Sequence, residues 1–221
     1  MDFYDRMRQL EVLQSCIFGV DKDKQAVAVA RLNLLLRGLH SREKLPMLEN
    51  IAHGDSLHPE TFEMHFSQIM KEGGFDVIVG NPPYVRIQTL DKSEVEFFNQ
   101  QFESATGNYD IYVLFVEKAL QLLKPGGVLG FILPNKFMQT SYGEGLRKLL
   151  SEQMSLLKLV SFGDAQVFQN ATTYTCMLFL KKEQNETFEY GLAERWLKEQ
   201  ITPLQLRDQD LSFIEITSII L

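Results

Sequence analysis

The stretch GFDVIVGNPPYVRIQ, residues 74–88, runs from an apolar segment directly into Asn-Pro-Pro-Tyr. Apolar residues occupy nearly every position of FDVIVG (75–80), which predicts a central strand that is covered on both faces. Each proline fixes φ and removes an N–H donor, so the turn that follows exposes carbonyl oxygens and few donors. The polar face of this turn therefore consists of acceptors, namely the side-chain oxygen of Asn81 and the carbonyl of Pro82.

Such a pair of acceptors suits an amine that is bonded to a flat conjugated ring or to a carbonyl. Two accepted hydrogen bonds hold the N–H groups and pull the nitrogen toward tetrahedral geometry, which frees its lone pair for attack. Tyr84 offers a flat face on which the ring can stack. The motif predicts a planar amine as nucleophile, and the alternative is a tight turn that only packs against the sheet.

Around this stretch, short strand-like runs alternate with helical patterns, which is typical of an α/β fold with a mostly parallel sheet and crossover helices. The predicted strands are 16–21, 50–55, 75–80, 128–134, 156–163 and 173–182, and the predicted helices are 24–38, a weaker one that ends near 71, 108–127 and about 142–152. The polar stretch 85–107 has little periodicity and predicts a functional or disordered loop. From about residue 184 the rhythm is lost, and the chain ends in the apolar FIEITSIIL (213–221), which reads as a strand in need of a neighbour.

Composition and charge limit the class of protein. A chain of 221 residues that is 45% hydrophobic can bury one sizeable core. Its net charge of −7 excludes an overall basic surface, so any affinity for nucleic acid requires a local patch or another segment. Cys16 and Cys176 lie in separate apolar runs without metal-ligand spacing, which predicts buried free thiols and no metal site. With no apolar run of membrane-spanning length and no signal peptide, we expect a soluble cytoplasmic protein.

Two acidic residues close predicted strands. In open parallel sheets, ligands bind outside the carboxyl ends of the strands. Asp21 lies at one such end, where a carboxylate can accept hydrogen bonds from ribose hydroxyls or cap the next helix, although Asp23 is the better cap. Asp55 can accept a hydrogen bond from an exocyclic amine such as that of adenine, or stabilise its own turn. Both roles stay open for Asp21, and the turn is the simpler role for Asp55.

The Asn-Pro-Pro-Tyr motif after a buried strand resembles the catalytic motif of S-adenosylmethionine-dependent amino-methyltransferases. The likeness is greatest to the gamma class of N6-adenine DNA methyltransferases in bacterial restriction-modification systems. Further stretches resemble motifs of this family in the same order: IFGVDKDKQAVAVARLNLLL (17–36), NIAHGDSL (50–57), GNYDIYVLFVEKALQLLKPGGVLGFILPNKFM (107–138) and VFQNATTYTCMLFLKK (167–182). The resemblance covers roughly residues 14–182. Asn-Pro-Pro-Tyr alone also occurs in methyltransferases that act on protein glutamine or ribosomal RNA.

The resemblance implies a Rossmann-like fold and a catalytic turn made of Asn81, Pro82, Pro83 and Tyr84. By analogy, an adenine leaves the stack of double-stranded DNA and enters a pocket between aromatic faces. Asn81 and the Pro82 carbonyl would hold its amine, while Tyr84 and Phe168 would stack on the base from opposite sides. Methylation of adenine N6 in DNA is the reaction that follows.

The resemblance also implies S-adenosylmethionine as cofactor. Asp21 would bind its ribose, Asp55 would contact its adenine, and Asn81 would place the target amine in line with the sulfonium methyl group. No metal is implied.

The chain departs from the pattern of the family in two respects. The glycine-rich first motif of the family lies on a strand before that of Asp21, and this chain does not contain it. A DNA-recognition domain should follow the catalytic core, and only residues 184–221 remain. We therefore expect residues 1–183 to be a partial, N-terminally truncated catalytic domain, with 184–221 an extension or the start of a linker. Alternatives are a non-catalytic fragment, or a methyltransferase for protein glutamine or RNA.

Overall fold

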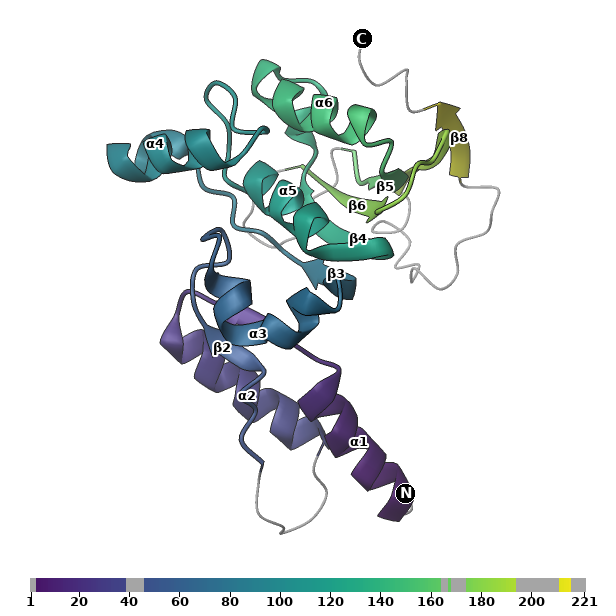
Figure 1. The fold of residues 1–221 in the computed structure, drawn as a ribbon. Coiled ribbons are helices and arrows are strands. Elements are labelled where there is room, and N and C mark those ends of the chain that lie inside the picture. Colours follow the sequence, from purple (N-terminus) through teal and green to yellow (C-terminus); the bar gives the residue numbers. More distant parts are fainter. Residues whose placement is uncertain (1–2, 39–45, 164–166, 168–173, 194–210, 216–221) are drawn as a thin grey trace. The chain divides into compact units, whose positions relative to one another are not determined.

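In the computed structural model of the protein (Figure 1), the described residues are 3–38, 46–163, 167, 174–193 and 211–215. The chain divides into two compact units, Met1–Glu72 and Gly73–Leu221. Within the described ranges, no helix is long and apolar enough to cross a membrane. A further division at residue 183, as expected from the sequence, stays a prediction.

The first unit contains a two-stranded parallel sheet. Its described elements are α1 (Phe3–Ser15), β1 (Gly19–Asp21), α2 (Lys24–Gly38), β2 (Ile51–His53) and α3 (Thr61–Lys71). The helix α2 is the crossover that a parallel pair of strands requires. Side chains of α1, α2, β2 and the segment before β2 form the core of this unit: Leu13, Val27, Ile51 and Leu48.

The second unit is built on a mixed sheet of six strands. The strands are β3 (Phe75–Gly80), β4 (Leu123–Pro134), β5 (Leu156–Ser161), β6 (Thr175–Lys181), β7 (Thr187–Leu192) and β8 (Leu211–Glu215), in the order β3-β4-β6-β5-β7-β8. The helices are α4 (Lys92–Gln101), α5 (Tyr112–Leu122) and α6 (Glu144–Glu152), with 3-10 turns η1 (Ile87–Thr89), η2 (Asn135–Met138) and η3 (Ser141–Gly143). β4 runs parallel to β3 and β7 parallel to β5, whereas β6 is antiparallel to both of its neighbours.

The core of the second unit lies between the sheet and two helices, because α5 and α6 pack on the same face of the sheet (Figure 1). Leu129 and Leu133 of β4 and Leu178 of β6 are fully buried. Burying one leucine side chain stabilises a fold by about 1.5–3 kcal/mol. This apolar layer fixes β4 in place, and β4 pairs in parallel with β3, whose carboxyl end carries the candidate site.

Most of the predicted elements are present. The helix predicted over 24–38 has these bounds as α2, and the strands predicted at 75–80, 128–134, 156–163 and 173–182 correspond to β3, β4, β5 and β6. Both cysteines are free thiols. Cys176 is buried in β6 as predicted, whereas Cys16 is exposed because it lies just after the last turn of α1.

The position of β3 differs from the prediction. β3 lies at the edge of the six-stranded sheet, and among the described strands only β4 pairs with it. Val77 and Val79 are 64% and 75% exposed, so β3 is not covered on both faces. The apolar sequence of β3 predicts that it forms a strand. Whether that strand is central or at the edge depends on which other strands pair with it. The sheet is also mixed rather than mostly parallel, because β6 inserts between β4 and β5 in the antiparallel direction.

The stretch 85–107 is not a continuous loop, because α4 forms within it. Phe98 and Phe102 are buried and pack edge to face with ring centroids 6.2 Å apart. The hydroxyl of Tyr109 donates a hydrogen bond to Oδ1 of Asn99 at 3.0 Å, which ties α4 to the segment before α5. Burial of these two rings and the hydrogen bond from Tyr109 therefore stabilise a helix within a stretch that was expected to have little periodicity.

Two further elements also differ from the expectation. The helix predicted over 108–127 ends at Leu122, because Leu123 pairs with Phe75 and begins β4. β7 lies after residue 184, where the sequence predicted no further strand or helix before the apolar end, and it pairs with β5 and with β8. β8 overlaps the first residues of the apolar stretch that was expected to need a neighbour.

Candidate functional site at the carboxyl ends of the strands

The turn Asn81–Tyr84 follows β3 directly and is exposed at two of its four positions. Asn81 and Pro83 are exposed, whereas Pro82 is buried and anchors the turn. Among the described residues, nothing forms a hydrogen bond with the side-chain amide of Asn81. The acceptor face predicted from the two prolines is therefore free to take a ligand.

Gly80 provides room for the turn. A Cβ atom at this position would lie 2.9 Å from Cε1 of Phe131, the residue of β4 that pairs with Gly80. The ring of Phe131 is buried, so it has little freedom to move aside. A residue without a side chain is therefore required immediately before Asn81.

Tyr84 is half-buried and is held by two contacts. Its hydroxyl donates a hydrogen bond to the carbonyl of Ile132 at 3.4 Å. Its ring meets that of Tyr112 edge to face, with centroids 6.4 Å apart and an interplanar angle of 76°. Burial, and to a smaller extent the nearby Cys176, raises the pKa of Tyr84 to about 12, so the phenol stays neutral near pH 7. The fold thus fixes the orientation of an uncharged aromatic ring next to Asn81.

The sequence did not predict a role for Tyr112 at the site. It is completely buried at the start of α5, and burial is the main cause that raises its pKa, followed by the neighbouring Tyr142. Its position in an apolar helix gives no sign of a role, and only the ring contact with Tyr84 reveals one. The signal available in the sequence was its place in the block 107–138, which the family resemblance already marked.

A group of charged residues lies beside the turn. Arg86 and Asp110 form an isolated antiparallel bridge, and Lys136 follows β4 in η2. Burial raises the pKa of Asp110, while the positive charges of Arg86 and Lys136 lower it. These residues were not singled out in the sequence, because they are separated by more than 20 positions along the chain and only the fold brings them together.

The two predicted cofactor residues lie at the carboxyl ends of β1 and β2, in the first unit. Asp21 Oδ1 accepts a hydrogen bond from the backbone N–H of Asp23 at 2.8 Å. Asp23 Oδ1 in turn accepts one from the N–H of Gln25 at 2.7 Å, so Asp23 caps α2 as predicted. Asp21 is therefore not wholly free, because one of its carboxylate oxygens shapes the loop.

Asp55 is engaged by its surroundings on both carboxylate oxygens. Its Oδ1 accepts a hydrogen bond from the N–H of Leu57 at 2.9 Å, and its Oδ2 lies 3.2 Å from Nζ of Lys22. The predicted turn role is thus present. Within the described ranges, no three His, Cys, Asp or Glu side chains are grouped in a way that would hold a metal ion.

The predicted site residues therefore form two sets. Asn81, Pro82, Pro83 and Tyr84 lie together after β3 in the second unit, and Asp21 and Asp55 lie together after β1 and β2 in the first unit. Phe168, the predicted second stacking residue, lies outside the described residues.

Comparisons with known proteins find relatives of this chain. The family model of the Eco57I restriction-modification methylase matches residues 15–168, which is more than half of the chain. The chain is 39% identical over 200 residues to the type II restriction enzyme and methyltransferase RM.Eco57I of Escherichia coli, covering 81% of this chain and 20% of that protein. It is 29% identical over 170 residues to the type II methyltransferase M.BanIII of Aneurinibacillus aneurinilyticus, covering 75% and 28%. The chain thus spans less than a third of the length of either relative.

Solved structures share the fold. The type I restriction-modification methyltransferase subunit of Streptococcus thermophilus matches with a TM-score of 0.65 and 19% identity, over 92% of this chain and 45% of that one. A candidate class I S-adenosylmethionine-dependent methyltransferase of Listeria monocytogenes matches with a TM-score of 0.53 and 21% identity, over 80% and 48%. The Rossmann-like α/β fold predicted from the sequence is confirmed.

Proposed function

Because the chain belongs to the Eco57I restriction-modification methylase family, we propose that it supplies the catalytic turn of an S-adenosylmethionine-dependent DNA methyltransferase that modifies N6 of adenine. The observation that carries this proposal is the exposed Asn81 amide, which has no partner among the described residues and lies next to two prolines and an immobilised tyrosine ring. The acceptor oxygens of Asn81 and Pro82, beside a flat ring, are suited to the amine of a nucleobase.

The residues of the turn orient and activate the target amine through hydrogen bonds. Oδ1 of Asn81 and the carbonyl of Pro82 accept hydrogen bonds from the two N–H groups. This directs the nitrogen lone pair away from the ring and makes the nitrogen nucleophilic. Once methylated, the nitrogen keeps one N–H and loses the other proton to solvent. Tyr84 holds the base by stacking, and its neutral phenol adds no charge that would compete for the amine. Rate enhancement arises from position and electrostatics rather than from a covalent intermediate.

The first unit offers a set of acceptors that fits the cofactor in part. Asp21 keeps one carboxylate oxygen without a hydrogen bond to any described residue, and this oxygen can accept from ribose hydroxyls. Asp55 can take the adenine amine only by sharing Oδ2 with Lys22. When bound, S-adenosylmethionine supplies an electrophilic methyl group on a sulfonium, which leaves as a neutral thioether.

The DNA specificity of the proposal can be tested by methyl transfer. The complete protein that contains residues 1–221 is incubated with tritiated S-adenosylmethionine and with DNA, RNA or release-factor protein. We expect label in DNA, at N6-methyladenine after nucleoside digestion. Label that appears only in protein glutamine or only in RNA would overturn the adenine assignment.

The 221-residue chain itself is tested by calorimetry with S-adenosylmethionine. Heat of binding at millimolar cofactor would support the proposal that the 221-residue chain binds the cofactor by itself, with Asp21 and Asp55 as ligands. An absence of heat, together with transfer by the complete protein, would show that other segments are needed for the cofactor.

A further inference from the structure

Three segments of the second unit meet beside the catalytic turn. The segment after Tyr84 runs along the segment before α5, because the N–H of Ile111 donates to the carbonyl of Val85 at 2.9 Å and the N–H of Ile87 donates to that of Tyr109 at 3.0 Å. The third segment is the end of β4, whose Ile132 carbonyl accepts the hydroxyl of Tyr84. The side chains of Arg86, Asp110 and Lys136 are brought to this edge of the sheet by these contacts.

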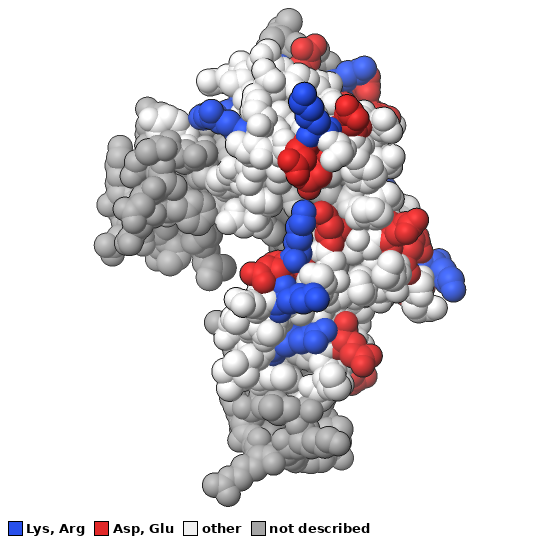
Figure 2. Space-filling view, turned by 90° about the vertical axis from the view of Figure 1, so that its left-hand side faces the viewer, with Lys and Arg blue, Asp and Glu red and all other residues white. Residues whose placement is uncertain are grey.

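The balance of charge at this edge is positive. Arg86 and Lys136 are both exposed, and Asp110 is the acidic residue between them. Neither cation forms an ion pair with an acidic side chain in the part of the chain that the structure describes. On the face that Figure 2 presents, Lys and Arg lie next to Asp and Glu. Two cations around one carboxylate give this edge a local excess of positive charge in a chain of net charge −7.

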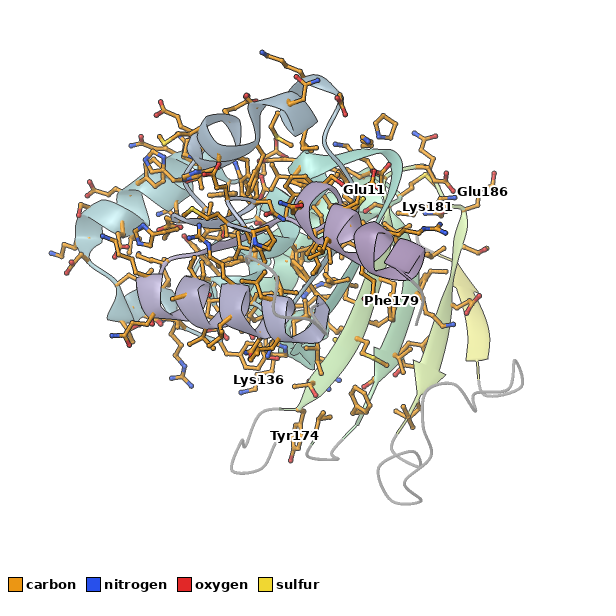
Figure 3. The ribbon with its side chains drawn as sticks, turned by 90° about the horizontal axis from the view of Figure 1, so that it is seen from below. Glu11, Lys136, Tyr174, Phe179, Lys181 and Glu186 are labelled. Atoms are coloured by element: carbon orange, nitrogen blue, oxygen red, sulfur yellow. The ribbon has the colours of Figure 1, made fainter. Side chains whose placement is uncertain are left out.

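An exposed aromatic residue lies at the same edge. Tyr174 directly precedes β6, which runs antiparallel to β4, so the beginning of β6 lies at the carboxyl end of β4. The N–H of Asn135 donates a hydrogen bond to the carbonyl of Tyr174 at 3.0 Å, which places Tyr174 next to the residue before Lys136. Figure 3 shows Lys136 and Tyr174 at one end of the strands. The side chain of Tyr174 is 41% exposed, a large apolar surface that the fold leaves open to solvent.

We propose that Arg86, Lys136 and Tyr174 form a binding surface for a nucleic-acid strand, in which the two cations contact phosphates and Tyr174 stacks on a base next to the one held by Tyr84. This inference rests on the proposed function and extends it to the strand that carries the target base. Cations along a backbone, interleaved with an aromatic ring, are the combination that binds single strands and unstacked bases without regard to sequence. The surface thus contributes affinity and position, and sequence must be read elsewhere.

Salt dependence separates phosphate contacts from structural effects. Binding of the complete protein to a fluorescent duplex is measured by anisotropy over a series of salt concentrations. Each of Arg86→Ala and Lys136→Ala should reduce the slope of log K against log salt by about 0.9. The matched control is Lys124→Ala, because Lys124 lies at the opposite end of β4, where it pairs with Asp76. This control should keep the slope of the unmodified protein.

Stacking by Tyr174 is tested with a pair of variants. Tyr174→Phe keeps an aromatic face and should bind DNA as the unmodified protein does. Tyr174→Ala should weaken binding about five- to 150-fold, in line with the effect of removing one stacked ring. Thermal unfolding should be the same for all of these variants, because the three side chains are exposed. Equal affinity of Tyr174→Ala and Tyr174→Phe would remove Tyr174 from the surface.

Failure of the surface and failure of the proposed function give different results. If methyl transfer to DNA occurs but Arg86→Ala and Lys136→Ala keep the full salt slope, the surface is wrong and the proposed function stands. If label enters only protein and no salt-dependent DNA binding is found, both are wrong. Transfer to DNA together with reduced slopes in both variants and an unchanged slope in Lys124→Ala supports both.

Discussion

The strand ends of the two units use their polar side chains in opposite ways. After β1 and β2, the carboxylates of Asp21 and Asp55 accept hydrogen bonds from the backbone of their own loops, and Asp55 also pairs with Lys22. After β3, the amide of Asn81 has no such partner among the described residues, and the loop is held by other groups. The side chains of Asp21 and Asp55 thus stabilise their own loops through hydrogen bonds. The side chain of Asn81 makes no such bond, so its loop is stabilised without it.

This difference predicts which substitutions change stability and which change only chemistry. A side chain that already has protein partners cannot be removed without a cost to the fold. A side chain with none can be removed at little cost, so its effect appears in binding or catalysis.

The largest effect is expected for Asn81→Ala. Loss of an acceptor that acts on the reacting amine should reduce methyl transfer by the complete protein by about 100-fold or more, with cofactor affinity and thermal unfolding nearly unchanged. Asn81→Asp keeps an acceptor oxygen and should retain part of the activity. Asn33→Ala, at an exposed position of α2, is the control and should have no effect. Unchanged turnover in Asn81→Ala would refute the role of the amide.

Gly80→Ala should disturb the turn through packing rather than through chemistry. The added methyl group would lie 2.9 Å from the buried ring of Phe131, and overpacking of this kind costs about 1–3 kcal/mol. Chemical denaturation should show this loss, and transfer should fall with it. The double variant Gly80→Ala/Phe131→Leu should recover part of the stability, because the smaller side chain makes room. No recovery would mean that the strain lies in the backbone instead.

Asp55→Ala should lower the free energy of unfolding in the first unit. It leaves the N–H of Leu57 without its acceptor and Lys22 without its ion pair, at an expected cost of about 1–2 kcal/mol. Asp55→Asn keeps an acceptor for Leu57 and should cost less. Asp76→Ala, in an exposed ion pair with Lys124, should be close to neutral. Equal stability of all three variants would contradict the structural role of Asp55.

A further effect, confined to high pH, is a dependence of stability on pH at Tyr84. Burial raises the pKa of Tyr84 from 10.0 to about 12, so between these values the native state keeps a proton that the unfolded chain loses. This contribution is present in full below pH 10 and is lost as the pH rises toward 12. Denaturation midpoints of the unmodified protein should therefore fall more steeply over this range than those of Tyr84→Phe. Parallel curves would mean that the phenol is not buried.

Prediction from the sequence succeeded where a short stretch of chain decides the structure. The bounds of α2 follow from Asp23, which caps its start, and from apolar positions at helical spacing. The acceptor character of the turn follows from Pro82 and Pro83, because a proline has no N–H in any fold. The roles of Phe168, Asp21 and Asp55 in binding stay predictions from the family resemblance.

Prediction failed where residues distant in sequence decide the structure. α4 forms because Phe98 and Phe102 are buried and because Tyr109 bonds to Asn99, and neither the burial nor the hydrogen bond can be read from the local sequence. The edge position of β3 depends on which strands pair with it, and an apolar run is equally compatible with a central place. The engagement of Asp55 by Lys22 requires two parallel strands to end side by side.

The sequence by itself determined that a strand ends in a turn that lacks two backbone N–H donors and carries an asparagine and a tyrosine, since these properties are covalent and local. Only the tertiary structure decided that Asn81 stays without a partner, that the ring of Tyr84 is held against Tyr112, and that Arg86 and Lys136 gather beside the turn. The physical reason is that exposure, ring contacts and charge balance depend on segments far apart in the chain. Those segments meet only when the sheet has formed.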